Sequence, residues 1–237
     1  MIKLSIVLPA YREKENLEVL IPQIEMEFGD IPCEIIVVDD NSCDGTRELI
    51  QDFQSRFPDL ILLERPALLG IGSALREGYN VARGEFILSS DADQSFSTTD
   101  MRSLFEKIQT GYDLVLGYRI TPSDRDSAGF DASLKGRFEN KIISPMSNLV
   151  IGVVSGLGLK NYNNNFRILR SSLWKCIHTV ENRQFFLFET IYRAKQQAAR
   201  IAEIPVTFSM RRIGDSKVSF FRQAPGYFLK LIRLVAS

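Results

Sequence analysis

Two aspartates, Asp91 and Asp93, follow a short apolar segment within the sequence GEFILSSDADQ. Residues 85–89 predict a buried strand, and both carboxylates come where that strand should end. Because residues i and i+2 of a strand point the same way, the two side chains can converge around the small Ala92. Two carboxylates this close repel each other unless a cation lies between them. Such hard oxygen ligands suit Mg²⁺ or Mn²⁺ together with phosphate oxygens.

A solvated acidic turn that caps the next helix is the alternative interpretation of this pair. The position after an apolar strand favours a metal–phosphate site, because open α/β sheets bind ligands at the carboxyl ends of their strands. Whether the chain has such a sheet therefore decides between the two interpretations.

The elements that must position the acidic pair alternate between strand and helix. Helices are predicted at residues 16–28, from 44 onward, at 73–82 and from 97 onward, and strands at residues 4–8, 34–38, 60–63, 85–89 and 113–117. Asp44 predicts an N-cap, and Ser97 with Asp100 predicts a capping box. This alternation predicts an α/β fold with a Rossmann-like, mostly parallel sheet and helices on both faces.

The second half of the chain is less regular. The pattern predicts a loop at 121–134, a helix at 136–154, a polar run at 161–165, a strand at 166–169, a helix at 184–197 and a strand at 202–208. No repeat or long linker separates the halves. We expect one domain, in which residues 1–118 bind a nucleotide and residues 119–237 bind an acceptor.

Polar and aromatic residues also follow the first two predicted strands: Pro9, Tyr11 and Glu13 after the first, and Asp39 and Asp40 after the second. These strand ends share one edge of a doubly wound sheet. Together with the acidic pair, these residues indicate a nucleotide-diphosphate site. The aromatic ring could stack on the base, the carboxylates could accept hydrogen bonds from the base or ribose, and the acidic pair could hold a metal ion that binds the phosphates. Taken singly, each has a structural explanation: loop packing, a helix-start charge or a turn acid.

Gly70 and Gly72 resemble part of a dinucleotide-binding turn, but Leu75 stands where the third glycine belongs. A tight turn before a packed helix explains both glycines.

The amino-acid composition excludes some classes of function. The 237 residues carry zero formal net charge, three cysteines and one histidine. No global field would recruit nucleic acid, and chemistry that needs several histidines is excluded. The single His178 lies in an apolar stretch and is predicted to be packed. Unpaired cysteines indicate a reducing cytosol. With no signal peptide pattern and no apolar run of about 20 residues, we expect a cytoplasmic protein.

Several motifs, spread over nearly the whole chain, together match the pattern of one known protein family. They are VLPAYREKEN at 7–16, VVDDNSCDGT at 37–46, DAD at 91–93, GYR at 117–119, NFRILR at 165–170, FETIYRA at 188–194 and RRIGDSK at 211–217. The chain resembles the family 2 glycosyltransferases of GT-A fold, and within them the dolichyl- or polyprenyl-phosphate mannose synthases.

The resemblance implies a role for each matching residue. Pro9, Tyr11, Glu13 and Asp40 would hold the nucleoside of a GDP- or UDP-linked sugar. Asp91, Ala92 and Asp93 would hold the diphosphate, with Mg²⁺ or Mn²⁺ on the two aspartates. Arg119 would face the phosphates or the acceptor, Arg137 and Ser144 would bind the acceptor phosphate, and Arg212 and Lys217 would close over the nucleotide. The product would serve cell-envelope glycan assembly.

The polar run departs from the family pattern. Asn161 stands where many relatives have an acidic residue, and Asn163, Asn164 and Asn165 stand among positions that hold Thr, Ser or Gly. A polyprenyl phosphate acceptor is already ionised and needs no general base. If the acceptor is a hydroxyl, Glu189 is the candidate base. The main prediction is therefore an inverting, metal-dependent transferase that moves a mannose-like hexose to a polyprenyl phosphate. The alternatives are a soluble transferase that acts on a hydroxyl and a non-catalytic domain that binds nucleotide sugars.

The C-terminal segment, residues 219–237, mixes aromatic and aliphatic residues with basic ones. It predicts either an amphipathic helix lying on an anionic membrane or a terminal helix packed on the core. The first alternative would place the protein at the cytosolic face of a membrane.

Overall fold

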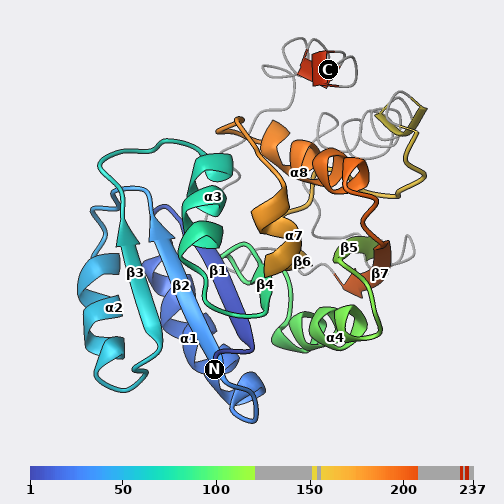
Figure 1. Ribbon diagram of the computed structural model, residues 1–237. Coiled ribbons are helices and arrows are strands. Elements are labelled where there is room, and N and C mark those ends of the chain that lie inside the picture. Colours follow the sequence, from blue (N-terminus) through green and yellow to red (C-terminus); the bar gives the residue numbers. More distant parts are fainter. Residues whose placement is uncertain (121–150, 154–155, 208–229, 232, 235–237) are drawn as a thin grey trace, which may run out of the picture.

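The computed structural model describes residues 1–120, 151–153, 156–207, 230–231 and 233–234. Within these residues the chain forms a seven-stranded sheet between two layers of helices (Figure 1). The strands are β1 Leu4–Ala10, β2 Cys33–Asp39, β3 Leu60–Glu64, β4 Phe86–Ser89, β5 Leu114–Ile120, β6 Arg167–Arg170 and β7 Ile201–Thr207. The helices are α1 Lys14–Phe28, α2 Thr46–Gln54, α3 Ile71–Val81, α4 Thr98–Gln109, α7 Ser171–Cys176 and α8 Phe185–Gln196.

The strand order is β3-β2-β1-β4-β6-β5-β7. Every pairing is parallel except those of β6, which runs antiparallel to both β4 and β5. Strands from the two halves of the sequence thus belong to one sheet. The predicted α/β fold with a mostly parallel sheet is confirmed.

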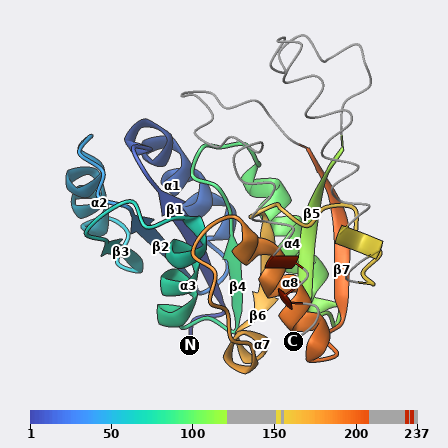
Figure 2. The same ribbon diagram turned by 90° about the horizontal axis from the view of Figure 1, so that it is seen from above.

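Alternate residues of the central strands enter two hydrophobic cores. Ile6 and Leu8 of β1 join the first core, whereas Val7 joins the second. This follows from the two-residue period of a strand, since neighbouring side chains point to opposite faces. Helices α1, α2 and α4 supply the first core, and α3, α7 and α8 supply the second (Figure 2). Both faces are therefore covered, as predicted.

Three local predictions have different outcomes. Ser97 is the N-cap of α4, and its hydroxyl accepts from the Asp100 backbone N–H at 3.1 Å, which confirms that cap. Asp44 is not the N-cap of α2. That position belongs to Gly45, and the Asp44 carboxylate accepts from the Thr46 backbone N–H instead. His178 is exposed rather than packed, because α7 ends before it.

Packing explains the two glycines before and within α3, as expected. Gly70 has a φ of +100°, which disfavours any side chain. A Cβ on Gly72 would lie 2.5 Å from the Cβ of Phe186 on α8. The start of α3 is thus held against α8.

Part of the predicted loop and helix at 121–154, and most of the C-terminal segment, lie outside the described residues. Of that segment, Leu231 and Leu234 are buried in the second core, and Lys230 forms an ion pair with Glu181. This short piece therefore follows the packed alternative. Among the described helices, none combines the length and the apolar character needed to cross a membrane.

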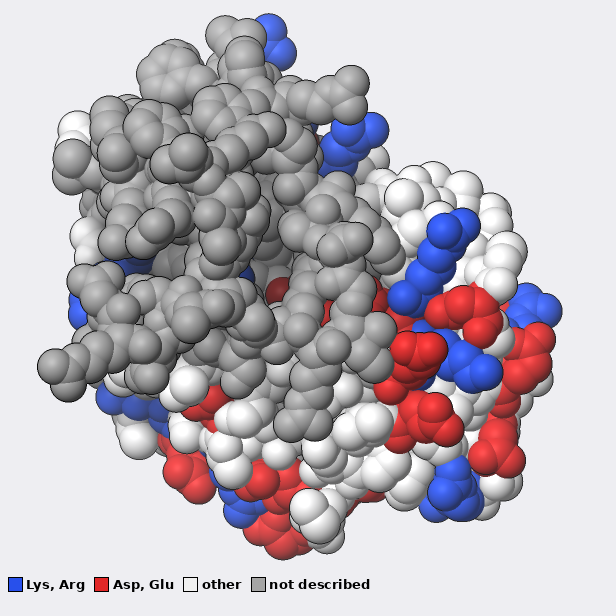
Figure 3. Space-filling view, turned by 180° about the vertical axis from the view of Figure 1, so that it is seen from behind, with Lys and Arg blue, Asp and Glu red and all other residues white. Residues whose placement is uncertain are grey.

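Acidic and basic side chains intermix on the described part of the face seen in Figure 3. This mixture agrees with the zero formal net charge of the chain.

Candidate active site

The order of the strands places the predicted site residues together. Strands β1 and β4 are neighbours in the sheet, although β2, β3 and their helices separate them in sequence. From β1 the chain builds outward to β2 and β3, and the later strands lie on the other side of β4. Such a reversal of strand order opens a crevice at the carboxyl ends of the strands. The loops after β1 and β4 meet there.

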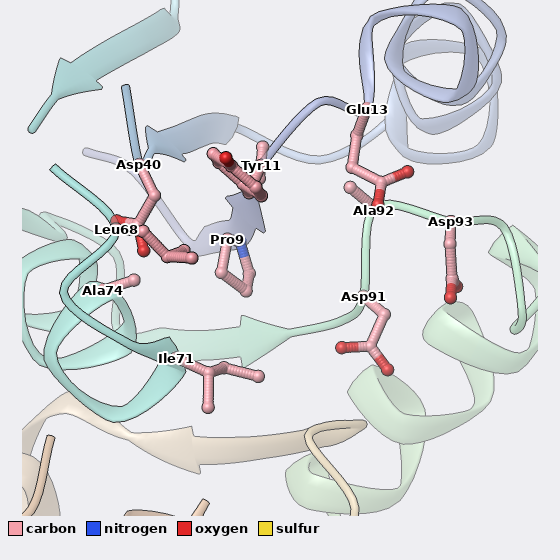
Figure 4. A pocket seen from close by; sticks show the side chains of 11 residues that line it. Pro9, Tyr11, Glu13, Asp40, Leu68, Ile71, Ala74, Asp91, Ala92 and Asp93 are labelled. Carbon is pink, nitrogen blue, oxygen red and sulfur yellow. The ribbon is translucent and has the colours of Figure 1, made fainter. Parts of the chain in front are cut away.

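A pocket with a volume of about 150 Å³ lies at this edge (Figure 4). Seven predicted site residues line it: Pro9, Tyr11, Glu13, Asp40, Asp91, Ala92 and Asp93. The first residues of α3 and the loop before it complete the wall with Leu68, Ile71 and Ala74. The volume is below the roughly 300 Å³ at which small-molecule sites begin. The described wall therefore suits only part of a nucleotide sugar.

The acidic pair lies in a turn beyond β4, which ends at Ser89. The alternation of strand side chains therefore does not apply to it, and that part of the prediction is wrong. Even so, Asp91 and Asp93 extend from the same loop to the same side (Figure 4). Asp93 is 3% exposed, and its Oδ1 accepts from the backbone N–H and the hydroxyl of Ser95 at 3.0 and 2.5 Å. The turn thus fixes the carboxylate of Asp93.

The donor set of this turn fits a divalent cation that arrives with its nucleotide. Among the described residues, no cluster of three or more His, Cys, Asp or Glu side chains could hold a metal ion. Mg²⁺ in proteins usually takes one or two carboxylates and completes its shell with phosphate oxygens and water. Asp91 and Asp93 would supply those two carboxylates.

Hydrogen bonds connect the loops after β1 and β4. The side-chain amide of Asn16 donates to the Glu13 carboxylate at 2.7 Å. The side-chain amide of Gln94, next to the acidic pair, donates to the backbone oxygen of Asn16 at 3.3 Å. These contacts hold Glu13 against the turn that carries the acidic pair.

Backbone strain gathers in the loops at this edge. Arg12, Asn41 and Gln94 follow β1, β2 and β4, and each has a φ between 58° and 61°. Asparagine tolerates this left-handed conformation, but for arginine and glutamine it costs on the order of 1 kcal/mol or more. Strain of this kind persists where the surrounding structure fixes the backbone, which is common at ligand sites.

A buried ion pair fixes Asp40. The Arg65 Nη1 lies 2.6 Å from the Asp40 Oδ1, and the exposed fractions of the two side chains are 1% and 6%. The Gly70 N–H donates to the other carboxylate oxygen at 3.4 Å. Burial raises the pKa of Asp40, while the charge of Arg65 and the Gly70 amide oppose that rise. Asp40 thus enters the pocket with a fixed orientation.

Glu189 has a different position from the one expected of a base. It is 1% exposed, and its carboxylate accepts from the backbone N–H groups of Val180 and Glu181 at 3.0 Å. It is not among the residues that line the pocket. These contacts give Glu189 a structural role in the loop before α8, and its role as a base for a hydroxyl acceptor stays a prediction.

Arg119 is exposed near the carboxyl end of β5 and does not line the described pocket. Four further predicted residues lie outside the described residues: Arg137, Ser144, Arg212 and Lys217. Their roles stay predictions.

Sequence reasoning gave no role to Arg65 or Asn165. Asn165 is 3% exposed, and its side-chain amide donates to the Asp91 Oδ1 at 3.3 Å. Its place in a run of asparagines that departs from the family pattern was a signal, but the run does not say which member faces Asp91. Arg65 directly follows β3, and no local pattern indicates that it is buried.

Comparison with known proteins identifies relatives. The family model described as "Glycosyl transferase family 2" matches residues 5–160, more than half of the chain. A dolichol-phosphate mannosyltransferase of Pyrococcus furiosus is 28% identical over 91% of this chain and 59% of its own length. A polyprenol monophosphomannose synthase of Mycolicibacterium smegmatis is 26% identical over 90% of this chain and 80% of its own. The chain thus spans less than two thirds of the Pyrococcus relative.

Solved structures share the fold. Glucosyl-3-phosphoglycerate synthase from Mycobacterium tuberculosis, in complex with Mn²⁺, UDP and glucosyl-3-phosphoglycerate, has a TM-score of 0.69 and 16% identity. The alignment covers 98% of this chain and 78% of that one. The same enzyme in complex with UDP alone gives a TM-score of 0.73 at 14% identity, over 99% of this chain and 80% of that one. These likenesses confirm the predicted GT-A fold. On the evidence of the family model, the chain belongs to glycosyl transferase family 2, as its motifs indicated.

Proposed function

We propose that this family member is an inverting, metal-dependent transferase that moves a mannose-like hexose from a nucleotide diphosphate sugar to a polyprenyl phosphate. The pocket at the carboxyl edge, where seven strand-end residues converge, carries this proposal. The chain would act as a single GT-A domain at the cytosolic face of a membrane. The donor would be a GDP- or UDP-linked sugar.

The pocket residues would divide the donor between them. Tyr11 would stack on the base, and Asp40, held by Arg65, would accept hydrogen bonds from it. Asp91 and Asp93 would hold Mg²⁺ or Mn²⁺ on the diphosphate. When bound, the cation offsets the negative charge that develops on the departing diphosphate. Arg119, Arg137, Ser144, Arg212 and Lys217 would bind phosphates of donor and acceptor, for which the arginine fork is suited.

The acceptor would be a phosphate rather than a hydroxyl. A lipid phosphate is ionised near neutral pH, so its oxygen can attack the anomeric carbon without a base. Glu189, the candidate base, is instead bonded to backbone amides. The names of the relatives from Pyrococcus furiosus and Mycolicibacterium smegmatis support a polyprenyl acceptor.

A binding and turnover experiment tests the proposal. Thermal shift with GDP, UDP and their sugars, each with Mn²⁺ or Mg²⁺, should show one preferred nucleotide, because a ligand that binds only the folded state raises stability. With that donor and a polyprenyl phosphate, turnover should be lost in Asp93→Ala. The control is Asp52→Ala, which removes an acid that is 73% exposed on α2 and does not line the pocket.

Each alternative has its own result. Transfer to a saccharide hydroxyl but not to the lipid phosphate would favour the hydroxyl-acceptor enzyme. Nucleotide-sugar binding without transfer to either acceptor would favour the non-catalytic domain. Turnover that persists in Asp93→Ala would refute metal binding by the acidic pair.

A further inference from the structure

Beneath the acidic pair, a chain of hydrogen bonds links β4 to the strand that follows the polar run. The hydroxyl of Ser89, the last residue of β4, donates to the backbone oxygen of Asn165 at 2.8 Å. The hydroxyl of Tyr79 on α3 lies 2.7 Å from the same Ser89 hydroxyl. Since Ser89 uses its one proton toward Asn165, Tyr79 must be the donor to Ser89. Asn165 is thus anchored through its backbone by fully buried groups.

This anchor presents the side chain of Asn165 to Asp91. The Asn165 Nδ2 donates to the Asp91 Oδ1 at 3.3 Å, and the two residues are 74 positions apart in sequence. A carboxylate only accepts hydrogen bonds, so the amide nitrogen must face it. A bond to a charged acceptor is stronger than one between neutral groups. Asn165 therefore helps to orient the Asp91 carboxylate.

The other end of the same amide has no hydrogen-bond partner among the residues that the structure describes. Within the described part of the chain, the Asn165 Oδ1 is buried and accepts no hydrogen bond. Buried polar atoms of this kind are rare because an unmade hydrogen bond is costly. The neighbouring Asn164 differs, since its Nδ2 donates to the Gly117 backbone oxygen at 2.9 Å and its Oδ1 accepts from the Phe166 backbone N–H at 3.1 Å. An acceptor left open beside Asp91 indicates a ligand that brings a donor.

We propose that Asn165 is a positioning residue of the donor complex, an inference that rests on the proposed function. Its Nδ2 orients the Asp91 carboxylate toward the divalent cation, and its Oδ1 accepts a hydrogen bond from an O–H group that enters with the ligand. Two O–H groups have this chemistry: a water on the cation and a hydroxyl of the transferred sugar. In either case Asn165 couples the later half of the chain to the acidic pair.

The affinity for Mn²⁺, measured by electron paramagnetic resonance, tests this inference without turnover. We use Asn165→Leu, which keeps nearly the same shape and removes both polar atoms. In the presence of the preferred nucleoside diphosphate, the Mn²⁺ affinity should fall about tenfold, the effect of losing one hydrogen bond to a charged group. An equal loss with the nucleoside diphosphate and with the nucleotide sugar assigns the metal-bound water. A further loss with the nucleotide sugar, beyond the loss seen with the nucleoside diphosphate, assigns the sugar hydroxyl.

The matched control is Asn164→Leu. This change removes two hydrogen bonds to backbone groups and leaves the contact between Asn165 and Asp91 in place. It should lower the thermal midpoint at least as much as Asn165→Leu while leaving the Mn²⁺ affinity unchanged. If Asn165→Leu does not fold, Asn165→Ala gives the same comparison. Wild-type affinity in the Asn165 variant, or an equal loss in the Asn164 control, overturns the inference. If the wild-type protein binds no Mn²⁺ with any nucleotide, the proposed function itself fails.

Discussion

The polar residues of the pocket are held by protein partners before any ligand binds. Asp93 is fixed by Ser95, Glu13 by Asn16, and Asp40 by Arg65. A carboxylate with a fixed orientation loses less side-chain entropy when it binds a ligand than one that rotates freely. The site therefore depends on residues that need not touch the ligand.

The Asp40–Arg65 ion pair gives the clearest test at this scale. In Arg65→Met, the Asp40 carboxylate would stay buried without its partner, and breaking a buried pair in this way costs about 3–5 kcal/mol. We expect that loss in the free energy of unfolding, measured by urea denaturation. In the control Arg56→Met, which breaks an exposed pair with Asp52, the change should stay within about 1 kcal/mol. Similar losses in both variants would contradict the importance of burial.

Among the elements, α3 matters most for the site, because its start forms one wall of the pocket. Its position depends on close contact with the loop before α8. A Cβ added to Gly72 would lie 2.8 Å from the backbone oxygens of Glu181 and Arg183. Backbone atoms cannot move aside as the end of a flexible side chain can.

We expect Gly72→Ala to destabilise the fold by about 1–3 kcal/mol through overpacking. It should also weaken nucleotide binding, because α3 must shift at the pocket wall. The control is Gly158→Ala, where a Cβ would meet no atom within 4 Å. Urea denaturation and nucleotide titration measure the two effects. A Gly72→Ala protein as stable as the control would contradict the packing argument.

An ion pair between elements makes stability depend on pH. Arg102 on α4 donates from Nη1 and Nη2 to both carboxylate oxygens of Asp30, each at 2.7 Å. These hydrogen bonds lower the pKa of Asp30 from its usual 3.8. Because the folded-state pKa is the lower one, the stabilisation is present above the unfolded-state pKa. It is lost as the pH falls through the folded-state pKa.

Asp30→Asn should therefore lower the urea midpoint at about pH 6 and match the wild-type midpoint in acid, once the pH lies below the folded-state pKa and Asp30 is protonated in both states. The control Asp52→Asn removes an exposed acid whose carboxylate lies 3.4 Å from the Arg56 guanidinium. It should change the urea midpoint neither at about pH 6 nor in acid. A difference between Asp30→Asn and wild type that persists in acid would show that the effect is not due to charge.

At the scale of the whole molecule, the proposed lipid acceptor requires the enzyme to reach a membrane surface. Leu231 and Leu234 are buried in the second core, so truncation before them would also damage the fold. The membrane hypothesis is better tested by Phe220→Ser with Phe221→Ser, which leaves the packed leucines in place.

This double variant should lose most of its co-sedimentation with anionic vesicles, because two apolar side chains no longer enter the interface. The control Met26→Ser changes a side chain that is 81% exposed on α1 and should pellet as wild type does. Equal pelleting of all three proteins would remove the membrane hypothesis.

Local sequence determined the strands, the first helices and the residues at the strand ends. The apolar period of β1, β2 and β4 shows where each strand ends, and Tyr11, Asp40 and Asp91 follow within two residues. The rule that ligands bind at the carboxyl edge of an open sheet then brings these residues together. This information lies within a few neighbouring residues, so the sequence alone reveals it.

Only the tertiary structure decided which distant residues support them. The antiparallel insertion of β6 beside β4 brings Asn165 to Asp91, and burial of the segment after β3 brings Arg65 to Asp40. Glu189, a reasonable base by type, is turned to backbone amides by the packing of α8. The contacts of Asn165 and Arg65 join residues far apart in sequence. No local period encodes them, because they arise from the way whole strands and helices pack.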